Sequence, residues 1–490
     1  MNTDNKTTKR NLIFYPIGTL GRDMIYALFT NFILLYIMYT RDLSNAQLGV
    51  ATVIMVSGRI LVAIFDPIMG NIIERTRSRF GKFKPWLAIG VLSTSIIVYL
   101  AFNTNLEGWS FIVFFGVVYY LYSFTFTMHD IAYWGMVPAL SSESDMRDKY
   151  VARATLFAGL GNVAACVLTP LLTTGEFALG GSANVAYGRI ALIICVLAPL
   201  FICFTLFGAK ENRDDMNKEA PKVSFKKIIG TLTGNDQLMW ILLIFLIQQI
   251  GNGIVTAGIG TNYIYFEFGY EGGLYSIFNT VGMAATAILM VFYPMISKRV
   301  HRKPLVKYMG ILGVIGYVIM LGAGLIMPTG MPEFWVITVG FLIANFGQYG
   351  LNLVMMVSIV NTVEYNEYKH GVRDEAIISS MRPFLTKIAS AFQVLITTVT
   401  YLILRVTDYT NEISSIERDA EQGLVSADEK SSLIAGIISE VGQSQTSGLL
   451  IAITVLPCAL MLVSCVLYRR FYKLDEERYD EICEELNSRK

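Results

Sequence analysis

The chain has 490 residues, of which 54% are hydrophobic and only 16% are charged, and its mean hydropathy is +0.51. A soluble protein of this length needs a larger charged surface, so the composition excludes an ordinary water-soluble domain and indicates a membrane protein. The formal net charge of +1 conceals an uneven distribution of charge along the chain. The six cysteines lie mostly in apolar segments without CxxC spacing, which predicts buried thiols.

Apolar segments long enough to cross a bilayer, which takes roughly 20 helical residues, recur along the chain. The twelve predicted spans are 12–38, 46–72, 86–103, 109–139, 150–174, 186–209, 236–262, 273–297, 305–327, 333–362, 374–406 and 447–468. Several exceed the minimum length, so we expect tilted or bent helices. Because alternating strand patterns are absent from these segments, the sequence predicts an all-α membrane protein.

Basic residues collect before the first span and after every second span, whereas the opposite loops carry few. By the positive-inside rule, both termini are expected in the cytoplasm of a multi-pass cell (inner) membrane protein. The first apolar segment lacks a cleavage signal, so we expect it to remain as a permanent span. The segment Asp408–Gln445 is acidic and long, and we expect short surface helices there without a predicted role.

Two pairs of matching residues indicate an internal repeat. Lys84-Pro85 and Lys303-Pro304 each open a span 219 residues apart, and Arg153 and Arg373 begin spans 220 residues apart. The predicted organisation is an N-terminal six-helix half (1–209), a cytoplasmic linker (210–235), a C-terminal six-helix half (236–470) and a cytoplasmic tail (471–490). Two such halves around a central cavity are typical of the major facilitator fold.

Charged side chains inside membrane spans are costly and usually face a partner or an aqueous pathway. They occur in both halves, at Arg22, Asp23, Arg59, Asp66, Asp130, Arg153, Arg382 and Lys387. For each one, a structural ion pair or a side chain that reaches the interface is an alternative. Three carboxylates in one half, with Lys387 in the other, nevertheless indicate a binding site. Trp134 shares a helical face with Asp130, and an aromatic ring there suits a sugar.

The carboxylates also indicate coupling to a cation. A carboxylate inside a membrane readily takes a proton or a metal ion, which removes its charge. We expect Lys387 to pair with these groups and to be released when they are neutralised, so that both ligands bias one two-state element. HExxH, GxxxxGK[ST] and GxSxG motifs are absent from the sequence. We therefore expect no enzyme, no cofactor and no nucleic-acid partner.

Several motifs closely resemble those of the glycoside-pentoside-hexuronide:cation symporters, a melibiose permease-like family of the major facilitator superfamily. They are Gly21–Asp23, Asp66–Gly70, Arg75–Trp86, Asp130–Pro138, Asn361–Lys369 with Arg373, and Thr386-Lys387. The resemblance covers about residues 11–470. It implies the same fold and the import of a sugar or glycoside together with a cation.

The resemblance also implies roles for individual residues. Substrate contacts are expected from Arg22, Asp23, Asp130, Trp134 and Arg153. The cation site is expected at Asp66, Asp130 and Thr127, with Lys387 between the two sites and itself among the substrate-binding residues. A cytoplasmic gate is expected from Arg75, Arg77, Arg79, Lys82, Lys84 and Arg373, which stabilises one conformation without touching substrate.

Two departures from the family pattern concern the cation. Val62 stands where sodium-using members carry a second acidic residue, and Phe65 stands where they have Asn. A sodium ion needs several oxygen ligands, whereas a proton needs one carboxylate. We therefore favour H⁺ over Na⁺ as the coupling ion, with Na⁺ at Asp66 as the alternative.

Two further departures concern the substrate. Arg382 and Pro383 replace a Gln-Thr pair of the melibiose permease, and Asn352 stands where that protein has Trp. We predict that Asn352 and Arg382 contact substrate. Because arginine binds carboxylates in a bidentate manner, an anionic glycoside such as a glucuronide is favoured over a neutral galactoside. The alternative is that Arg382 pairs with a carboxylate of the protein.

The sequence thus predicts a secondary active sugar transporter, acting as a monomer in the lipid bilayer. A cation-independent facilitator or exchanger of the same fold is the first alternative. A non-transporting membrane sensor is an alternative from a different class. The sugar, the coupling ion and the direction of flux are not defined by the sequence.

Overall fold

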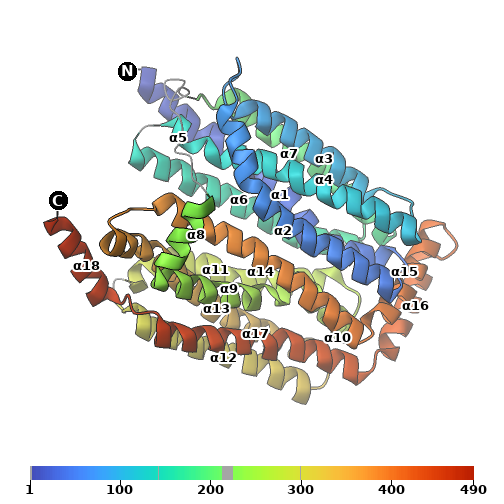
Figure 1. Cartoon of the computed structure of the whole chain (residues 1–490). Coiled ribbons are helices and arrows are strands. Elements are labelled where there is room, and N and C mark those ends of the chain that lie inside the picture. Colours follow the sequence, from blue (N-terminus) through green and yellow to red (C-terminus); the bar gives the residue numbers. More distant parts are fainter. Residues whose placement is uncertain (1–2, 142, 212–224, 298, 490) are drawn as a thin grey trace. The chain divides into compact units, whose positions relative to one another are not determined.

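The computed structural model describes residues 3–141, 143–211, 225–297 and 299–489, and this part of the chain is helical and free of strands (Figure 1). Twelve of its helices are long and apolar enough to span a membrane, which confirms the predicted fold class. The chain forms two compact units. The first comprises residues 1–220, 269–276 and 405–441, and the second comprises 221–268, 277–404 and 442–490. Half of the predicted linker, residues 212–224, lies outside the described residues, and the predicted boundaries of the halves stay a prediction.

The first unit contains the first six spans and several further helices. Its helices are α1 (Thr3–Thr40), α2 (Asn45–Arg75), α3 (Lys84–Phe102), α4 (Gly108–Gly135), the short α5 (Val137–Leu140), α6 (Ser144–Thr173), η1 (Gly175–Phe177), α7 (Ala183–Cys203) with a final π-helical turn η2 (Phe204–Gly208), α15 (Val406–Glu421) and α16 (Ala427–Glu440). Span four therefore ends at Gly135, before the predicted boundary, and α5 follows as a separate turn.

The second unit contains the other six spans. Its helices are α8 (Phe225–Gly234), α9 (Asp236–Gly253), the π-helical η4 (Val255–Ile259), α10 (Gly260–Phe268), α11 (Gly272–Ser297), which begins in the first unit, α12 (Arg302–Ile326), α13 (Met331–His370), α14 (Glu375–Ile403), α17 (Gln443–Phe471) and α18 (Glu476–Ser488). Span seven is broken at η4, where Gly258 has φ 117°, a conformation that favours glycine. The span consequently extends to Phe268, beyond its predicted end.

In each unit, the lysine of the repeated Lys-Pro pair makes a hydrogen bond that holds the start of that unit's third span. In the first unit, Lys84 Nζ donates to the carbonyl oxygen of Ala209 at 2.7 Å, just after span six. In the second unit, Lys303 Nζ donates to Asp475 Oδ2 at 2.7 Å, just after span twelve. Glu211, two residues after Ala209, accepts the backbone N–H of Lys82 at 3.0 Å, and Glu476, directly after Asp475, accepts that of Arg302 at 2.7 Å. The Lys-Pro pairs therefore occupy equivalent structural positions.

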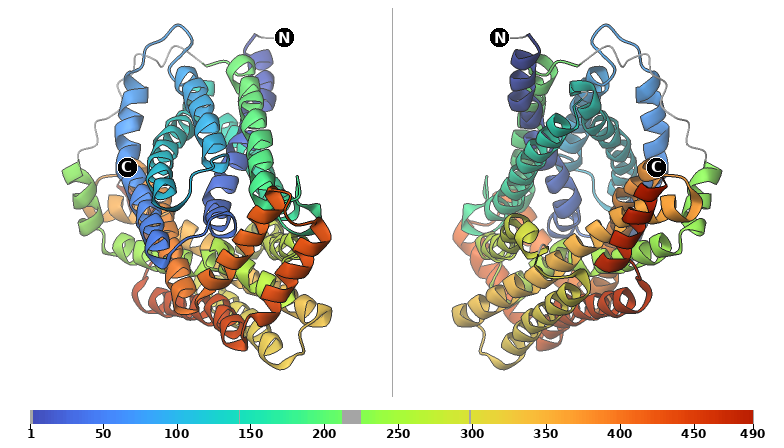
Figure 2. Two further views of the ribbon diagram at one scale, coloured as in Figure 1. Left: turned by 90° about the vertical axis from the view of Figure 1, so that its right-hand side faces the viewer. Right: turned by 90° about the vertical axis from the view of Figure 1, so that its left-hand side faces the viewer.

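The C-terminal tail contains the helix α18. Helix α18 turns away from α17 at the end that carries the C-terminus (Figures 1 and 2). Its first turn is fixed by the Asp475 side chain, which accepts the N–H of Arg478. The ion pairs of Asp475 with Lys303 and of Glu476 with Arg302 then hold α18 against the start of α12.

The acidic segment after span eleven forms a helical hairpin, α15–α16, that packs on the first unit (Figure 1). Asn411 makes two hydrogen bonds with one backbone residue, since its Nδ2 donates to Leu43 O at 2.9 Å and its Oδ1 accepts the Leu43 N–H at 3.2 Å. Thr407 adds a hydrogen bond to Asn45 at 3.0 Å. These contacts tie α15 to the turn between α1 and α2.

A buried ion pair anchors the same hairpin to the start of α7. Glu417 and Lys430 are 3.4 Å apart, with side chains only 1% and 7% exposed. Glu417 also accepts the N–H of Ala183 at 2.7 Å, and Lys430 donates to Gly181 O at 2.8 Å. Both charges are thus hydrogen-bonded, as burial of an ion pair requires. These contacts hold the hairpin in one defined position on the first unit.

Candidate functional site

The most concentrated charge cluster of the first unit is built around Arg22 on α1. Its Nε and Nη2 donate to Oδ2 of the neighbouring Asp23 at 3.0 and 2.7 Å. Its Nη1 donates to Oδ1 of Asp130 on α4 at 2.7 Å. Three of the predicted substrate-binding residues therefore form one bridge between two spans.

Two aromatic rings of α4 complete this cluster. The guanidinium carbon of Arg22 lies 5.2 Å from the ring centroids of both Tyr133 and Trp134, within the range of a cation–π interaction. Asp130, Tyr133 and Trp134 are three and four residues apart, so one face of α4 carries all three. The predicted proximity of Trp134 and Asp130 agrees with this geometry.

The backbone next to the cluster is tightly fixed. Tyr15 and Tyr133 stack with ring centroids 4.5 Å apart, and each hydroxyl donates to the other residue's carbonyl oxygen. Gly21 lies against α7, where an added Cβ would come within 2.5 Å of Ala198 Cα. The Gly-Arg-Asp motif thus needs glycine for close helix packing, and this packing positions Arg22.

The three charges differ in their access to solvent. The side chain of Arg22 is 4% exposed, that of Asp23 is 16% exposed, and that of Asp130 is 31% exposed. One guanidinium and two carboxylates carry one excess negative charge. Asp130 is therefore the carboxylate of this cluster that a cation or a substrate hydroxyl reaches most easily.

The predicted cation-site residues lie on α2 and α4, which pack together. Thr127 is buried one turn before Asp130 on α4. The Oδ1 atom of Asp66 is buried on α2. The neighbouring Phe65 packs edge-on against Phe124 with centroids 4.7 Å apart, which fixes α2 beside the turn that precedes Thr127.

The other predicted substrate residues lie on other helices than α1 and α4. Arg153 is exposed on α6, and its Nη1 donates to Leu12 O at 3.2 Å. Asn352 on α13 and Arg382 and Lys387 on α14 belong to the second unit. The Oδ1 atom of Asn352 is buried, and the described part of the chain offers it no hydrogen-bond donor.

The predicted gate residues divide between two structures. In the first, the turn between α2 and α3 is closed by hydrogen bonds from Trp86 Nε1 to Thr76 Oγ1 at 2.7 Å and from Ser78 Oγ to Gly81 O at 2.6 Å. The predicted cations of this turn surround it, at Arg75, Arg77, Arg79, Lys82 and Lys84. In the second, Arg373 forms ion pairs of 2.8–3.2 Å with Glu364, Glu367 and Glu375.

Glu211 is a residue of the basic turn that the sequence did not reveal. Its carboxylate accepts the Lys82 N–H, and it fits against Gly81, whose φ of 109° and lack of Cβ leave the necessary room. Burial raises the pKa of Glu211, although the N–H of Lys82 and the charge of Lys84 oppose that shift. The sequence does not reveal this role of Glu211, because Lys84 and Glu211 are 127 residues apart and only the fold brings them together.

A polar cluster in the second unit was also missed. Gln248 Nε2 donates to the side-chain and backbone oxygens of Gln348 at 3.2 and 3.0 Å. Gln348 Nε2 in turn donates to Tyr317 Oη at 3.0 Å, and all three residues are buried. These residues carry no charge, so they do not stand out from the apolar spans as Arg22, Asp23 and Asp130 do. Buried glutamines on different predicted spans are the signal that could have indicated them.

The twelve spans and the intramembrane charge cluster define a polytopic membrane transporter. A D-xylose–proton symporter of known structure has a similar fold, with a TM-score of 0.60 and 12% identity over 95% of this chain and 98% of that protein. The sequence model of the MFS/sugar transport protein family matches residues 14–476, so the chain belongs to this family. The resemblance to the glycoside-pentoside-hexuronide:cation symporters is thereby confirmed.

Individual relatives are sugar carriers by name. A lactose permease of Leuconostoc lactis is 29% identical over 404 residues, which cover 78% of this chain. This chain spans 60% of that permease's length. A glucuronide carrier protein homolog of Escherichia coli K12 is 25% identical over 487 residues, which cover 98% of this chain and 96% of that protein.

Proposed function

We propose that this protein is a secondary active transporter that imports a glycoside or hexuronide together with a cation. The Arg22 bridge is the observation that carries the proposal. It holds two carboxylates and two aromatic side chains within one membrane-embedded unit, where charges are retained mainly for function. Carboxylates and a tryptophan ring are also groups that suit the hydroxyls and apolar faces of a sugar.

The charge balance of the bridge supports cation coupling. With Arg22 paired to both carboxylates, the cluster carries one excess negative charge. Uptake of one cation at Asp130 makes this cluster electrically neutral, and a neutral cluster costs less free energy than a charged one when it moves between environments. A cation that stabilises the substrate-binding arrangement thereby couples its own movement to that of the sugar.

A proton fits the proposed cation site better than sodium does. Sodium needs several oxygen ligands, and Val62 and Phe65 offer none from the side chains next to Asp66. A single carboxylate suffices for a proton. We therefore propose H⁺ as the coupling ion, with Thr127 and Asp130 completing the site.

The substrate class is proposed from the relatives and from Arg382. The relatives are named for lactose and for a glucuronide. Arg382 is exposed on α14, and the described residues of its own unit give it no carboxylate partner. An unneutralised guanidinium supports recognition of an anionic sugar by a bidentate hydrogen bond. We propose that Asn352, Arg382 and Lys387 contribute to substrate binding.

The proposed orientation places both termini in the cytoplasm of the cell membrane. Basic residues gather at one end of the first unit, where Arg10 donates to Phe207 O and Asn11 bonds to Lys210. The acidic hairpin packs at the other end of α1. This distribution agrees with the positive-inside rule. The proposed gate residues lie on the cytoplasmic side, and the proposed working form is a monomer.

Counterflow in right-side-out membrane vesicles tests the substrate class. Vesicles that contain the wild-type chain or Arg382→Gln are loaded with unlabelled methyl glucuronide or methyl galactoside. The entry of the same sugar in labelled form is then measured. We expect preference for the glucuronide in the wild type and loss of that preference in the variant. Equal exchange of both sugars by the wild type would remove the anionic assignment. Exchange of neither, by a correctly folded chain, would exclude both a glucuronide and a galactoside as the transported sugar.

A further inference from the structure

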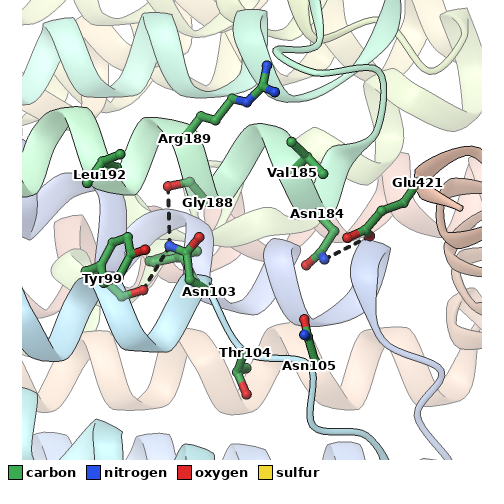
Figure 3. A pocket seen from close by; sticks show the side chains of 11 residues that line it. Tyr99, Asn103, Thr104, Asn105, Asn184, Val185, Gly188, Arg189, Leu192 and Glu421 are labelled. Atoms are coloured by element: carbon green, nitrogen blue, oxygen red, sulfur yellow. Dashed lines mark hydrogen bonds between the residues drawn. The ribbon is translucent and has the colours of Figure 1, made fainter.

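A second polar site lies apart from Arg22, where α3 ends and α7 begins (Figure 3). The pocket has a volume of about 230 Å³ and is lined by the last turn of α3, the loop after it, the first turns of α7 and Glu421 at the end of α15. All of these segments belong to the first unit. The volume is below the roughly 300–1,000 Å³ of sites that enclose a drug-sized ligand, so the pocket suits a small polar group.

The pocket is lined by one basic and one acidic residue, Arg189 and Glu421, which do not pair with each other. Arg189 extends from α7 toward the turn at Gly180, and no carboxylate of the described chain contacts it (Figure 3). Glu421 is positioned by Asn184, whose Nδ2 donates to its Oε2 at 3.0 Å. No cation among the described residues neutralises it. Separate, unneutralised charges of opposite sign are complementary to a zwitterion.

The remaining polar groups of the pocket are already partly fixed. Asn103 Nδ2 donates to the carbonyl oxygens of Tyr99 and Gly188, at 3.0 and 3.3 Å, which joins α3 to α7 below the pocket. Asn105 projects from the loop after α3 on the pocket's other side (Figure 3). The pocket therefore lies beside a hydrogen-bonded contact between α3 and α7.

One wall of the pocket continues into the lipid-facing surface. Leu192 on α7 and Tyr99 on α3 line the pocket and are exposed. Further along the same spans, away from the pocket, Val196 and Ile96 are also exposed apolar side chains. Exposed apolar residues on spanning helices contact acyl chains, and a tyrosine near a span end is typical of the interface. A lipid can thus place its headgroup in the pocket and its chains along α3 and α7.

We propose that this pocket binds the headgroup of a phospholipid that carries a primary amine, with the phosphate at Arg189 and the ammonium at Glu421. Arginine binds phosphate through directed N–H donors. A primary ammonium donates hydrogen bonds to a carboxylate, which a quaternary ammonium cannot do. In the proposed orientation the lipid belongs to the outer leaflet. The inference does not rest on sugar transport.

The position of Glu421 gives such a lipid a structural effect. Arg189 belongs to α7 and Glu421 to the hairpin, so one headgroup contacts both. A ligand that binds only the docked arrangement stabilises that arrangement. We therefore expect the lipid to hold the α15–α16 hairpin on the first unit, in addition to the contacts of Asn411 and Glu417.

Native mass spectrometry of the full-length, detergent-purified protein tests the site. The probes are phosphatidylethanolamine, phosphatidylcholine and phosphatidylglycerol with identical acyl chains. We expect the wild type to bind the ethanolamine lipid about tenfold more tightly than the other two, which corresponds to about 1.4 kcal/mol. Glu421→Gln should abolish this preference while leaving phosphatidylglycerol binding unchanged. Arg189→Gln should weaken binding of all three lipids by about tenfold.

Two matched substitutions serve as controls. Glu412→Gln removes an exposed carboxylate of the same helix α15, and Arg299→Gln removes an exposed arginine elsewhere on the surface. Neither residue lines the pocket, so both variants should bind lipid as the wild type does. Equal lipid binding by the wild type and both pocket variants would overturn the proposal. Displacement of the lipid by an equal concentration of soluble phosphoethanolamine would instead indicate a water-soluble ligand.

Discussion

Substituting Asp130 with Asn separates cation coupling from sugar binding. The amide oxygen of Asn can still accept from Arg22 Nη1, which lies 2.7 Å from Asp130 Oδ1 in the native protein. The change therefore replaces a hydrogen bond between two charged groups, worth about 1.5–3 kcal/mol, by a weaker one from the charged guanidinium to a neutral amide oxygen. The expected loss in free energy of unfolding is about 1–2 kcal/mol, at the lower end because Asp130 is 31% exposed.

The functional effect of Asp130→Asn should be much larger than its effect on stability. The Arg22–Asp23 pair stays intact, and the cluster becomes neutral without a bound cation. We expect counterflow exchange of sugar to persist and accumulation against a gradient to be lost. Both are measured in the same vesicle preparation, with Asp148→Asn as a control because Asp148 is an exposed carboxylate of α6.

Replacing Arg22 by Met provides the contrasting perturbation. It leaves Asp23 and Asp130 without their shared cation, and loss of one partner from a buried ion pair costs about 3–5 kcal/mol. This variant should therefore lose thermal stability as well as both transport activities. An Asp130→Asn protein that still concentrates sugar, or an Arg22→Met protein as stable as the wild type, would refute the reasoning.

Three further predictions concern the hairpin and the basic turn. Asn411→Ala removes both hydrogen bonds to Leu43 and should weaken hairpin docking by about 1–2 kcal/mol, seen as faster amide hydrogen exchange in α15; unchanged exchange would contradict the assigned contact. Burial raises the pKa of Glu417 despite opposition from its cationic partner, so the docked hairpin binds a proton more readily than the released one. Its contribution to docking is therefore greatest at low pH and declines as pH rises through the raised pKa. Exchange in α15, corrected for intrinsic rates, should accordingly be slower at acid than at neutral pH, and Glu417→Gln should abolish the difference. Trp86→Phe deletes the hydrogen-bond donor to Thr76 and should destabilise the closed basic turn by about 1 kcal/mol. Tryptic cleavage in the turn should then be about fivefold faster. An unchanged cleavage rate would show that this hydrogen bond does not hold the turn closed.

The spans and the central charges were accessible from sequence because both obey simple physical limits. A bilayer demands about 20 apolar residues for each helix, so hydropathy reveals the spans. Charges are rare there, so Arg22, Asp23 and Asp130 stand out individually. The sequence did not show that Arg22 contacts both carboxylates, because residue spacing fixes a helical face but not which faces meet.

The attachment of the α15–α16 hairpin to the first unit could not be predicted from composition or hydropathy. Acidic composition correctly indicated surface helices after span eleven. Their attachment depends on Asn411 and Leu43, which are 368 residues apart, and on a carboxylate at Glu417 that resembles its solvated neighbours in sequence. The break in span seven is similar, since Gly258 is one of 41 glycines and nothing in its sequence context indicates the positive φ that it adopts.

Accumulation of a labelled glucuronide in right-side-out vesicles, with proton and sodium gradients imposed separately, tests proton-coupled sugar import most directly. The account predicts accumulation when an inward proton gradient is imposed without sodium, and none when a sodium gradient is imposed at equal pH on both sides. Accumulation that follows the sodium gradient and ignores the proton gradient would contradict the proposed coupling at Asp66 and Asp130. Equilibration without accumulation under either gradient would identify an uncoupled facilitator instead.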